Sequence, residues 1–191
     1  MTSLAPGKLI IISGPSGAGK TTLVSQLFER CDLPLAAAVS ATTRKPRPGE
    51  VDGRDYYFID EQTFQQRRLA GDFLECCEVF GSGHWYGTLR SEVTPSLAAG
   101  KWVVLEIDVQ GTLAVLEHYP DAITIFVRPR SLEELERRLR DRGTESEAAI
   151  QRRLEVARRE WMFAERYRHQ VINDDVERSV QQLCDILTNG G

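Results

Sequence analysis

The 191-residue chain has no long apolar run, only four cysteines and no excess of positive charge. Its strongly apolar runs, such as Leu9 to Ile12, are much shorter than the roughly 20 residues of a membrane-spanning helix. Residues 1–8 lack the basic region and the apolar stretch of a secretory signal. The balance of 24 basic and 28 acidic residues argues against binding of nucleic acid through bulk charge. We therefore expect neither a membrane nor a nucleic acid as a partner.

The cysteines indicate the cellular compartment. Cys31, Cys76, Cys77 and Cys184 lack metal-site spacing, and the adjacent pair is poorly placed for a mutual disulfide. Reduced thiols are typical of the cytoplasm, so we predict a cytoplasmic protein. What the chain does have is 41% hydrophobic residues, which is enough to bury the core of one domain.

Four short apolar runs predict the strands of a buried sheet. They do not alternate polar and apolar residues, which is typical of parallel strands covered on both faces. The runs are Lys8 to Ser13, Trp102 to Ile107, Ala122 to Val127 and Gln170 to Asn173. Helical patterns lie between them, the first over Thr21 to Arg30. The predicted fold class is therefore α/β with a parallel sheet.

Two capping boxes predict helix starts in the second half of the chain. Ser131 with Glu134 opens a helix that ends at Gly143, and Thr144 with Glu147 opens the next helix. An apolar stripe with a period of 3.6 residues then follows on Ile150, Leu154, Ala157 and Trp161. These two helices are expected to pack through their apolar faces.

The clearest motif is a glycine-rich loop between the first strand and the first helix. It matches G-x-x-x-x-G-K-[ST] over Gly14, Pro15, Ser16, Gly17, Ala18, Gly19, Lys20 and Thr21. Glycines let backbone N–H groups wrap a phosphate at a helix N-terminus. We expect Lys20 to reach the β- and γ-phosphates of ATP, and Thr21 to bind Mg²⁺, partly through water. The alternative is a glycine-rich turn without a ligand, against which the strand–loop–helix context argues.

The stretch 40–88 is rich in Thr, Pro, Gly and Tyr and predicts loops and short strands inserted between core elements. Two prolines stiffen the segment that presents Arg44 and Arg47. Paired guanidinium groups suit a phosphate monoester, and the hydroxyl of Tyr56 would add a third donor. From charge alone, a solvated basic loop is the simpler interpretation.

Six segments occur in one order along nearly the whole chain. They are the glycine-rich loop, 42–50 (Thr-Thr-Arg-x-Pro-Arg-x-Gly-Glu), Phe73-Leu74-Glu75, Tyr86-Gly87-Thr88, Ile107-Asp108-x-Gln110-Gly111 and Ile172-Asn173-Asp174-Asp175. In this combination the chain resembles the guanylate kinase family. The resemblance implies a P-loop NTPase core at about 1–38, 89–129 and 154–191. Into this single domain it places a GMP-binding insertion of mixed short strands at about 39–88 and a helical lid at about 130–153.

The resemblance also implies an activity, the ATP-dependent phosphorylation of GMP to GDP in purine nucleotide metabolism and GMP recycling. ATP and GMP would be the substrates, with dGMP as a further acceptor, Mg²⁺ as the cofactor and no obligatory protein partner. The implied GMP contacts are Ser40, Arg44, Arg47, Tyr56, Glu75, Tyr86, Thr88 and Asp108. An ionised Glu75 would accept from N1–H and the 2-amino group of guanine, whereas adenine offers neither donor. Thr88 and Ser40 would donate to O6 or N7.

The remaining implied roles concern ATP and the phosphoryl group in transfer. Asn173 is assigned to the neighbourhood of the adenine. The implied catalytic residues are Lys20, Arg47, Arg138, Arg142 and Arg153. Arg142 and Arg153 are expected to reach the phosphates only when the lid folds over the site, where cations stabilise the charge in transfer.

Two positions depart from the family pattern. Glu106 stands where the family usually has Asp, and the segment 81–87 is about two residues longer than the usual turn. Two other functions remain as alternatives. A kinase-like module that binds phosphorylated peptides would typically have a degraded phosphate loop. A kinase for a phosphorylated sugar would lack a carboxylate for the guanine edge, the role that the resemblance implies for Glu75.

Overall fold

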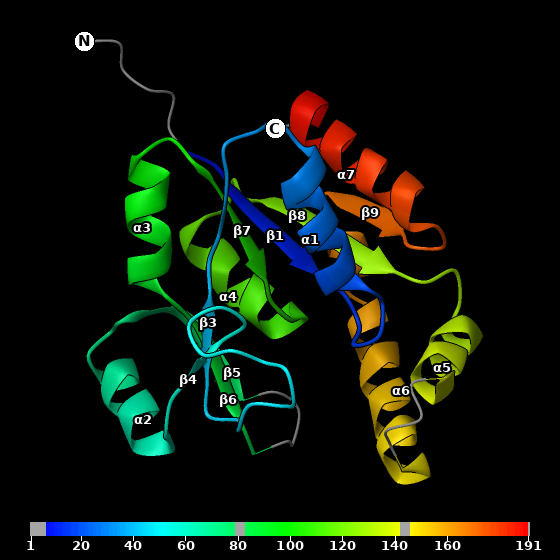
Figure 1. The fold of residues 1–191 in the computed structure, drawn as a ribbon, viewed down its shortest axis with the longest axis horizontal. Coiled ribbons are helices and arrows are strands. Elements are labelled where there is room, and N and C mark those ends of the chain that lie inside the picture. Colours follow the sequence, from blue (N-terminus) through cyan, green and yellow to red (C-terminus); the bar gives the residue numbers. More distant parts are fainter. Residues whose placement is uncertain (1–6, 79–82, 142–145, 191) are drawn as a thin grey trace. The chain divides into compact units, whose positions relative to one another are not determined.

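The computed structural model describes residues 7–78, 83–141 and 146–190. Helices and strands follow one another along the chain as drawn in Figure 1. They are β1 (Leu9–Ser13), α1 (Lys20–Arg30), β2 (Leu35–Ala37), β3 (Ser40–Thr42), β4 (Tyr57–Phe58), α2 (Glu61–Leu69), β5 (Phe73–Glu78), β6 (Trp85–Leu89), α3 (Arg90–Ala98), β7 (Trp102–Glu106), α4 (Val109–His118), β8 (Ile123–Arg128), α5 (Leu132–Asp141), α6 (Glu147–Trp161), the short 3₁₀ helix η1 (Ala164–Arg166), β9 (His169–Ile172) and α7 (Val176–Gly190).

The main sheet has five strands in the order β2-β7-β1-β8-β9. Its strands include the four apolar runs predicted from the sequence, and β2 pairs with β7, and β8 with β9, in parallel. Every residue of β1 is buried, as expected of a strand covered on both faces. The strand β2 was not predicted, because it is only three residues long, with Leu35 and Ala36 partly buried and Ala37 exposed. The α/β class with a parallel central sheet is confirmed.

A second sheet of four strands, in the order β4-β3-β6-β5, is formed by residues 40–89. The sequence predicted short strands here but not the helix α2, in which Phe64 is the one buried residue. The ring of Phe64 stacks on Phe73 with their centroids 4.5 Å apart. With Ala41 and Leu89, these two rings form the small core that supports the sheet. A single aromatic residue is too weak a periodic signal for a helix to be predicted.

Helices α5 and α6 pack through the cluster Leu135, Leu139, Ile150, Leu154 and Ala157. The predicted cap at Ser131 is confirmed, because its hydroxyl accepts from the backbone N–H of Glu134 at 3.3 Å. The predicted start of the next helix at Thr144 is wrong. The N-cap is Ser146, whose hydroxyl accepts from the N–H of Ala149, while Gly143 and Thr144 lie outside the described residues.

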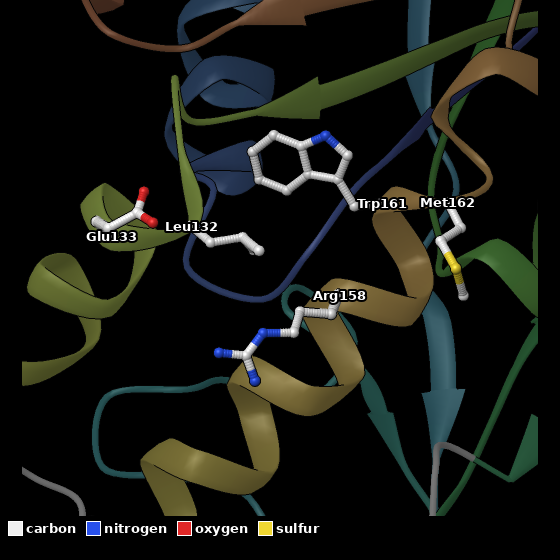
Figure 2. A pocket seen from close by; sticks show the side chains of 5 residues that line it. All are labelled: Leu132, Glu133, Arg158, Trp161 and Met162. Carbon is white, nitrogen blue, oxygen red and sulfur yellow. The ribbon is translucent and has the colours of Figure 1, made fainter.

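The end of α6 also differs from the predicted stripe. Trp161 is only half-buried, and Glu160 is buried in its place. Trp161 lines a surface hollow of about 420 Å³ together with Leu132, Glu133, Arg158 and Met162. Figure 2 shows these five side chains. The guanidinium group of Arg128 lies 5.1 Å from the centre of the Trp161 ring, so a cation–π contact holds this tryptophan at the surface.

The chain divides into two compact units. The first comprises Met1–Ile10, Pro34–Leu105 and Gln110–Ala122, and the second Ile11–Leu33, Glu106–Val109 and Ile123–Gly191. Within the second unit, α1 packs along α7. In the described part of the chain, no helix combines the length and the apolar character needed to cross a bilayer.

Candidate functional site

The glycine-rich loop of the second unit has a conformation that requires its glycines. Gly14 has φ +138°, and a Cβ placed on it would lie 1.9 Å from the carbonyl oxygen of Val127. Gly19 has φ +87°, and a Cβ there would lie 2.4 Å from Nδ2 of Asn173. Gly19 is also the N-cap of α1 and offers no side-chain acceptor to the first turn. The backbone N–H groups at this end of the helix suit an anionic ligand.

Lys20 and Thr21 begin α1 and point their polar groups at different partners. The ammonium group of Lys20 donates to the carbonyl oxygens of Gly14, at 2.6 Å, and of Pro15, at 3.1 Å. The hydroxyl of Thr21 donates to Oε1 of Glu106 at 2.8 Å. Glu106, at the end of β7, is thus in direct contact with the predicted magnesium ligand. The side chain that departs from the family pattern therefore orients Thr21.

Asn173 connects the end of β9 to the phosphate loop. Its side-chain N–H donates to the carbonyl oxygen of Ala18 at 2.7 Å, and the side chain is buried. Arg138 on α5 donates to the backbone carbonyl of Asn173 at 2.6 Å and forms an ion pair with Glu134. The predicted residues Arg138 and Asn173 thus form one hydrogen-bonded chain with the loop.

Arg153, a predicted lid residue on α6, lies beside the phosphate loop. Its guanidinium group donates to Oγ of Ser16 at 3.1 Å. The cause is the position of α6, whose apolar face packs on α5 and brings Arg153 beside the loop. That Arg153 reaches the phosphates only when the lid folds over the site stays a prediction. The other predicted lid residue, Arg142, lies outside the described residues.

Ser40, Thr88 and Glu75 lie in one row across the small sheet of the first unit. Strand register pairs Ser40 with Thr88, and Thr88 with Glu75. Directly paired residues on adjacent strands share a face, which explains how positions up to 48 residues apart in sequence meet. A register shift between Phe73 and Glu75 marks a bulge, the kind of irregularity that re-aims a side chain. Glu75 is 6% exposed and accepts from the hydroxyl of Thr88 at 2.8 Å.

Arg44 is the centre of a second group of predicted residues in the same unit. Its guanidinium group forms a fork with both carboxylate oxygens of Glu50, at 2.8 and 2.9 Å. Its Nε donates to the hydroxyl of Tyr86 at 3.2 Å, and its Cζ lies 5.4 Å from the centre of the Tyr56 ring. Glu50 also accepts from the backbone N–H of Arg47 at 2.6 Å. Hydrogen bonds from Arg44 lower the pKa of the Glu50 carboxyl, so it stays ionised at neutral pH.

The predicted GMP contacts are divided between the units. Asp108 lies in the second unit, whereas the other seven lie in the first. Asp108 exerts an electrostatic influence on Glu160, the buried carboxyl of α6, as does Lys20. No role was predicted from the sequence for Glu50 or Glu160. The spacing of Glu160, three residues after Ala157 on the buried stripe, is a signal that could have found it. Nothing in the sequence marks Glu50 apart from its position in the arginine segment.

Comparisons with known proteins, by sequence and by structure, give consistent matches. The family model described as guanylate kinase matches residues 6–190. The chain is 57% identical over 184 residues to a guanylate kinase of Rhodopirellula baltica, covering 95% of this chain and 88% of the relative. It is 50% identical over 185 residues to one of Thermosynechococcus vestitus, covering 96% and 95%. The crystal structure of guanylate kinase from Anaplasma phagocytophilum matches with a TM-score of 0.80 at 30% identity, covering 97% of this chain and 87% of that one.

Proposed function

This chain belongs to the guanylate kinase family, and we propose that it phosphorylates GMP with ATP through two clusters of residues, one for each substrate. The reaction transfers the γ-phosphoryl group of ATP to the phosphate of GMP and yields ADP and GDP. In our proposal the loop 14–21 binds ATP and the cluster around Glu75 and Arg44 binds GMP. The observation that carries this division is the row of Ser40, Thr88 and Glu75, which places hydroxyl groups and a buried carboxylate side by side.

The guanine would be recognised by Glu75 and its two hydroxyl neighbours. A buried carboxylate presents two acceptor oxygens and suits the adjacent N1–H and 2-amino donors of guanine. Ser40 would donate to O6 or N7, and so would Thr88 once its hydroxyl turns from Oε1 of Glu75 to the base. Adenine would not supply the two hydrogen bonds that guanine gives to this carboxylate, and an unsatisfied buried acceptor costs about 1–3 kcal/mol, or more when charged. dGMP presents the same base and phosphate and is expected to be a second acceptor.

The phosphate of GMP would be held by Arg44, Arg47, Tyr56 and Tyr86. Arg44 is preorganised, because the Glu50 fork and the Tyr86 hydroxyl fix its guanidinium group. A fixed guanidinium group loses less conformational entropy on binding phosphate than a free one. Arg47 is exposed and is assigned to both GMP and the phosphoryl group in transfer.

ATP would be held by the loop backbone, Lys20 and Asn173, with Arg138, Arg142 and Arg153 stabilising the phosphoryl group in transfer. Positioning and charge stabilisation carry most phosphoryl transfer, so no covalent intermediate is required. Arg153 is supported in this role by its contact with Ser16. Asp108 is proposed as the GMP contact contributed by the second unit.

Mg²⁺ fits the oxygen atoms at the start of α1. This ion usually keeps several waters and takes only one or two protein oxygens besides the substrate phosphates. Thr21 would hold it, partly through water, and Glu106 would orient the Thr21 hydroxyl as it does in the structure. When bound, the ion neutralises charge on the β- and γ-phosphates.

We further propose that the core, the GMP-binding insertion and the lid have the limits predicted from the sequence, and that the protein works in the cytoplasm. All four cysteines are free thiols, which is the usual state in a reducing compartment.

The function is tested by an assay of ADP release with GMP, AMP, CMP and UMP as acceptors. Strong release with GMP alone supports it, and equal release with AMP contradicts the assignment of Glu75.

A further inference from the structure

Glu160 is a carboxyl group on the buried face of α6. Leu154 and Ala157 form that face against α5, and Glu160 follows three residues later at the same helical spacing. The side chain is 6% exposed, and its Oε2 atom has no hydrogen-bond partner among the described residues. An unpaired buried carboxylate is costly, so this position is stable only if the charge is neutralised or matched by a cation.

Two charged groups of the second unit act on Glu160. The ammonium group of Lys20 favours the ionised carboxylate, and the carboxylate of Asp108 opposes it. Burial has the largest influence, and the net effect raises the pKa of Glu160 to about 7. Near neutral pH the side chain is therefore divided between its ionised and its protonated form.

Bound ATP would change the electrostatic surroundings of Glu160 in two ways. The phosphates place several negative charges on the loop, and like charges disfavour a nearby carboxylate. They also compete for the charge of Lys20, whose ammonium group donates to the loop carbonyls of Gly14 and Pro15. Both changes favour protonation of Glu160.

We propose that Glu160 takes up a proton from solvent when ATP binds, so that its neutral carboxyl no longer competes with the phosphates for the charge of Lys20. This role rests on the proposed function, in which the loop 14–21 binds ATP. The step is a simple protonation, in which carboxylate and a buffer proton give carboxylic acid. Glu160 is thus a positioning residue, which acts on ATP through Lys20 without touching the reacting atoms.

The test is calorimetry of ATP with Mg²⁺, without GMP, at pH 7.5 in two buffers of different ionisation enthalpy. The dependence of the heat on the buffer gives the number of protons taken up. We expect wild-type protein to take up on the order of half a proton more than Glu160→Gln, which cannot titrate. Glu155→Gln is the matched control, because Glu155 is exposed on the same helix. It should behave as wild type.

The pH dependence of ATP affinity provides a second measurement. Between pH 7 and 8.5 the wild-type dissociation constant should rise more steeply than that of Glu160→Gln, because uptake of a proton becomes harder as pH rises. Equal proton uptake by wild type and Glu160→Gln, or parallel pH profiles, would overturn the proposal. Absence of any ATP binding by wild type would instead overturn the assignment of the loop, so the two failures are distinguishable.

Discussion

Thr88 donates its hydroxyl proton to Oε1 of Glu75 across 2.8 Å, and both side chains are buried. The bond holds the carboxylate in one orientation, in which we expect it to accept from the base. Preorganised acceptors in a buried site discriminate strongly, because a ligand without matching donors leaves them unpaired.

Base selectivity follows from this pair of residues. Sites that hydrogen-bond a defined donor set can reject analogues that lack it by roughly 10⁴-fold or more. We expect a preference of this size for GMP over AMP in kcat/KM, and collapse of GMP phosphorylation in Glu75→Ala. Glu78→Ala, on the exposed end of the same strand, is the control and should keep near-normal activity. Unchanged GMP phosphorylation in Glu75→Ala would contradict the guanine pocket.

Lys20→Met tests the phosphate loop. Methionine keeps a long flexible stem but removes the charge assigned to the β- and γ-phosphates. We expect loss of most of kcat with little change in melting temperature, measured by steady-state kinetics and thermal unfolding. Lys101→Met is the control, because Lys101 is exposed in the first unit. Near-normal turnover in Lys20→Met would show that the loop assignment is wrong.

Arg153 provides a test of transition-state stabilisation. An arginine supplied to a phosphoryl transition state is worth on the order of 10³-fold in turnover. We expect Arg153→Ala to lower kcat by about this factor, while GMP affinity measured by calorimetry without ATP changes little. Arg153→Lys should rescue only partly, because an ammonium group lacks the planar fork. The same kinetic pattern is expected for Arg142→Ala.

The control for Arg153 is its exposed neighbour Arg152. Arg152→Ala should leave kcat within about twofold of wild type, since surface charges contribute little. If Arg153→Ala kept full turnover, its contact with Ser16 would be structural. The cationic role would then have to lie with Arg138 or Arg142.

Glu50 is expected to act on GMP through Arg44. Glu50→Gln removes the ionised half of the fork that fixes the guanidinium group. We expect KM for GMP to rise by about tenfold with a smaller change in kcat, because charge-assisted hydrogen bonds contribute about 1.5–3 kcal/mol. Glu117→Gln, an exposed residue of the first unit, is the control. A fall in KM would mean instead that Glu50 competes with the phosphate for Arg44.

The parts of the fold that the sequence predicted are those with strong local signals. The apolar runs of β1, β7, β8 and β9 and the cap at Ser131 are marked within a few residues of chain. The helix α2 was not predicted, because Phe64 is its one buried residue and gives no periodic apolar pattern. The start of α6 was misplaced because Thr144 and Ser146 are both good caps, and tertiary packing decides between such neighbours.

The residues of the candidate site differ in the same way, because some carry a local signal in the sequence and others depend on distant contacts. A loop such as 14–21 is contiguous, so its residue types and spacing suffice to predict it. Glu106 and Glu160 act through partners more than 50 residues away, and no local pattern predicts such contacts. The position of Arg153 beside Ser16 likewise depends on how α6 packs on α5, which the sequence does not state.

The buried carboxyl of Glu160 is also expected to make the free energy of unfolding depend on pH. Its pKa of about 7 in the folded chain lies above its ordinary value of 4.5, so between these values the folded state binds more protons than the unfolded state. The free energy of unfolding of the wild type therefore falls as pH rises through this window, and the loss is complete above pH 7. Glu160→Gln has no such loss, because it carries no titrating group. From pH 5 to pH 8 the stability of Glu160→Gln relative to wild type should rise by about 2 kcal/mol, measured by urea unfolding.

With Glu155→Gln, whose side chain is exposed on the same helix, the difference from wild type should stay within about 0.5 kcal/mol at both pH values. A constant difference between Glu160→Gln and wild type across this range would mean that Glu160 keeps an ordinary pKa, and that solvent or a cation reaches it in the folded chain.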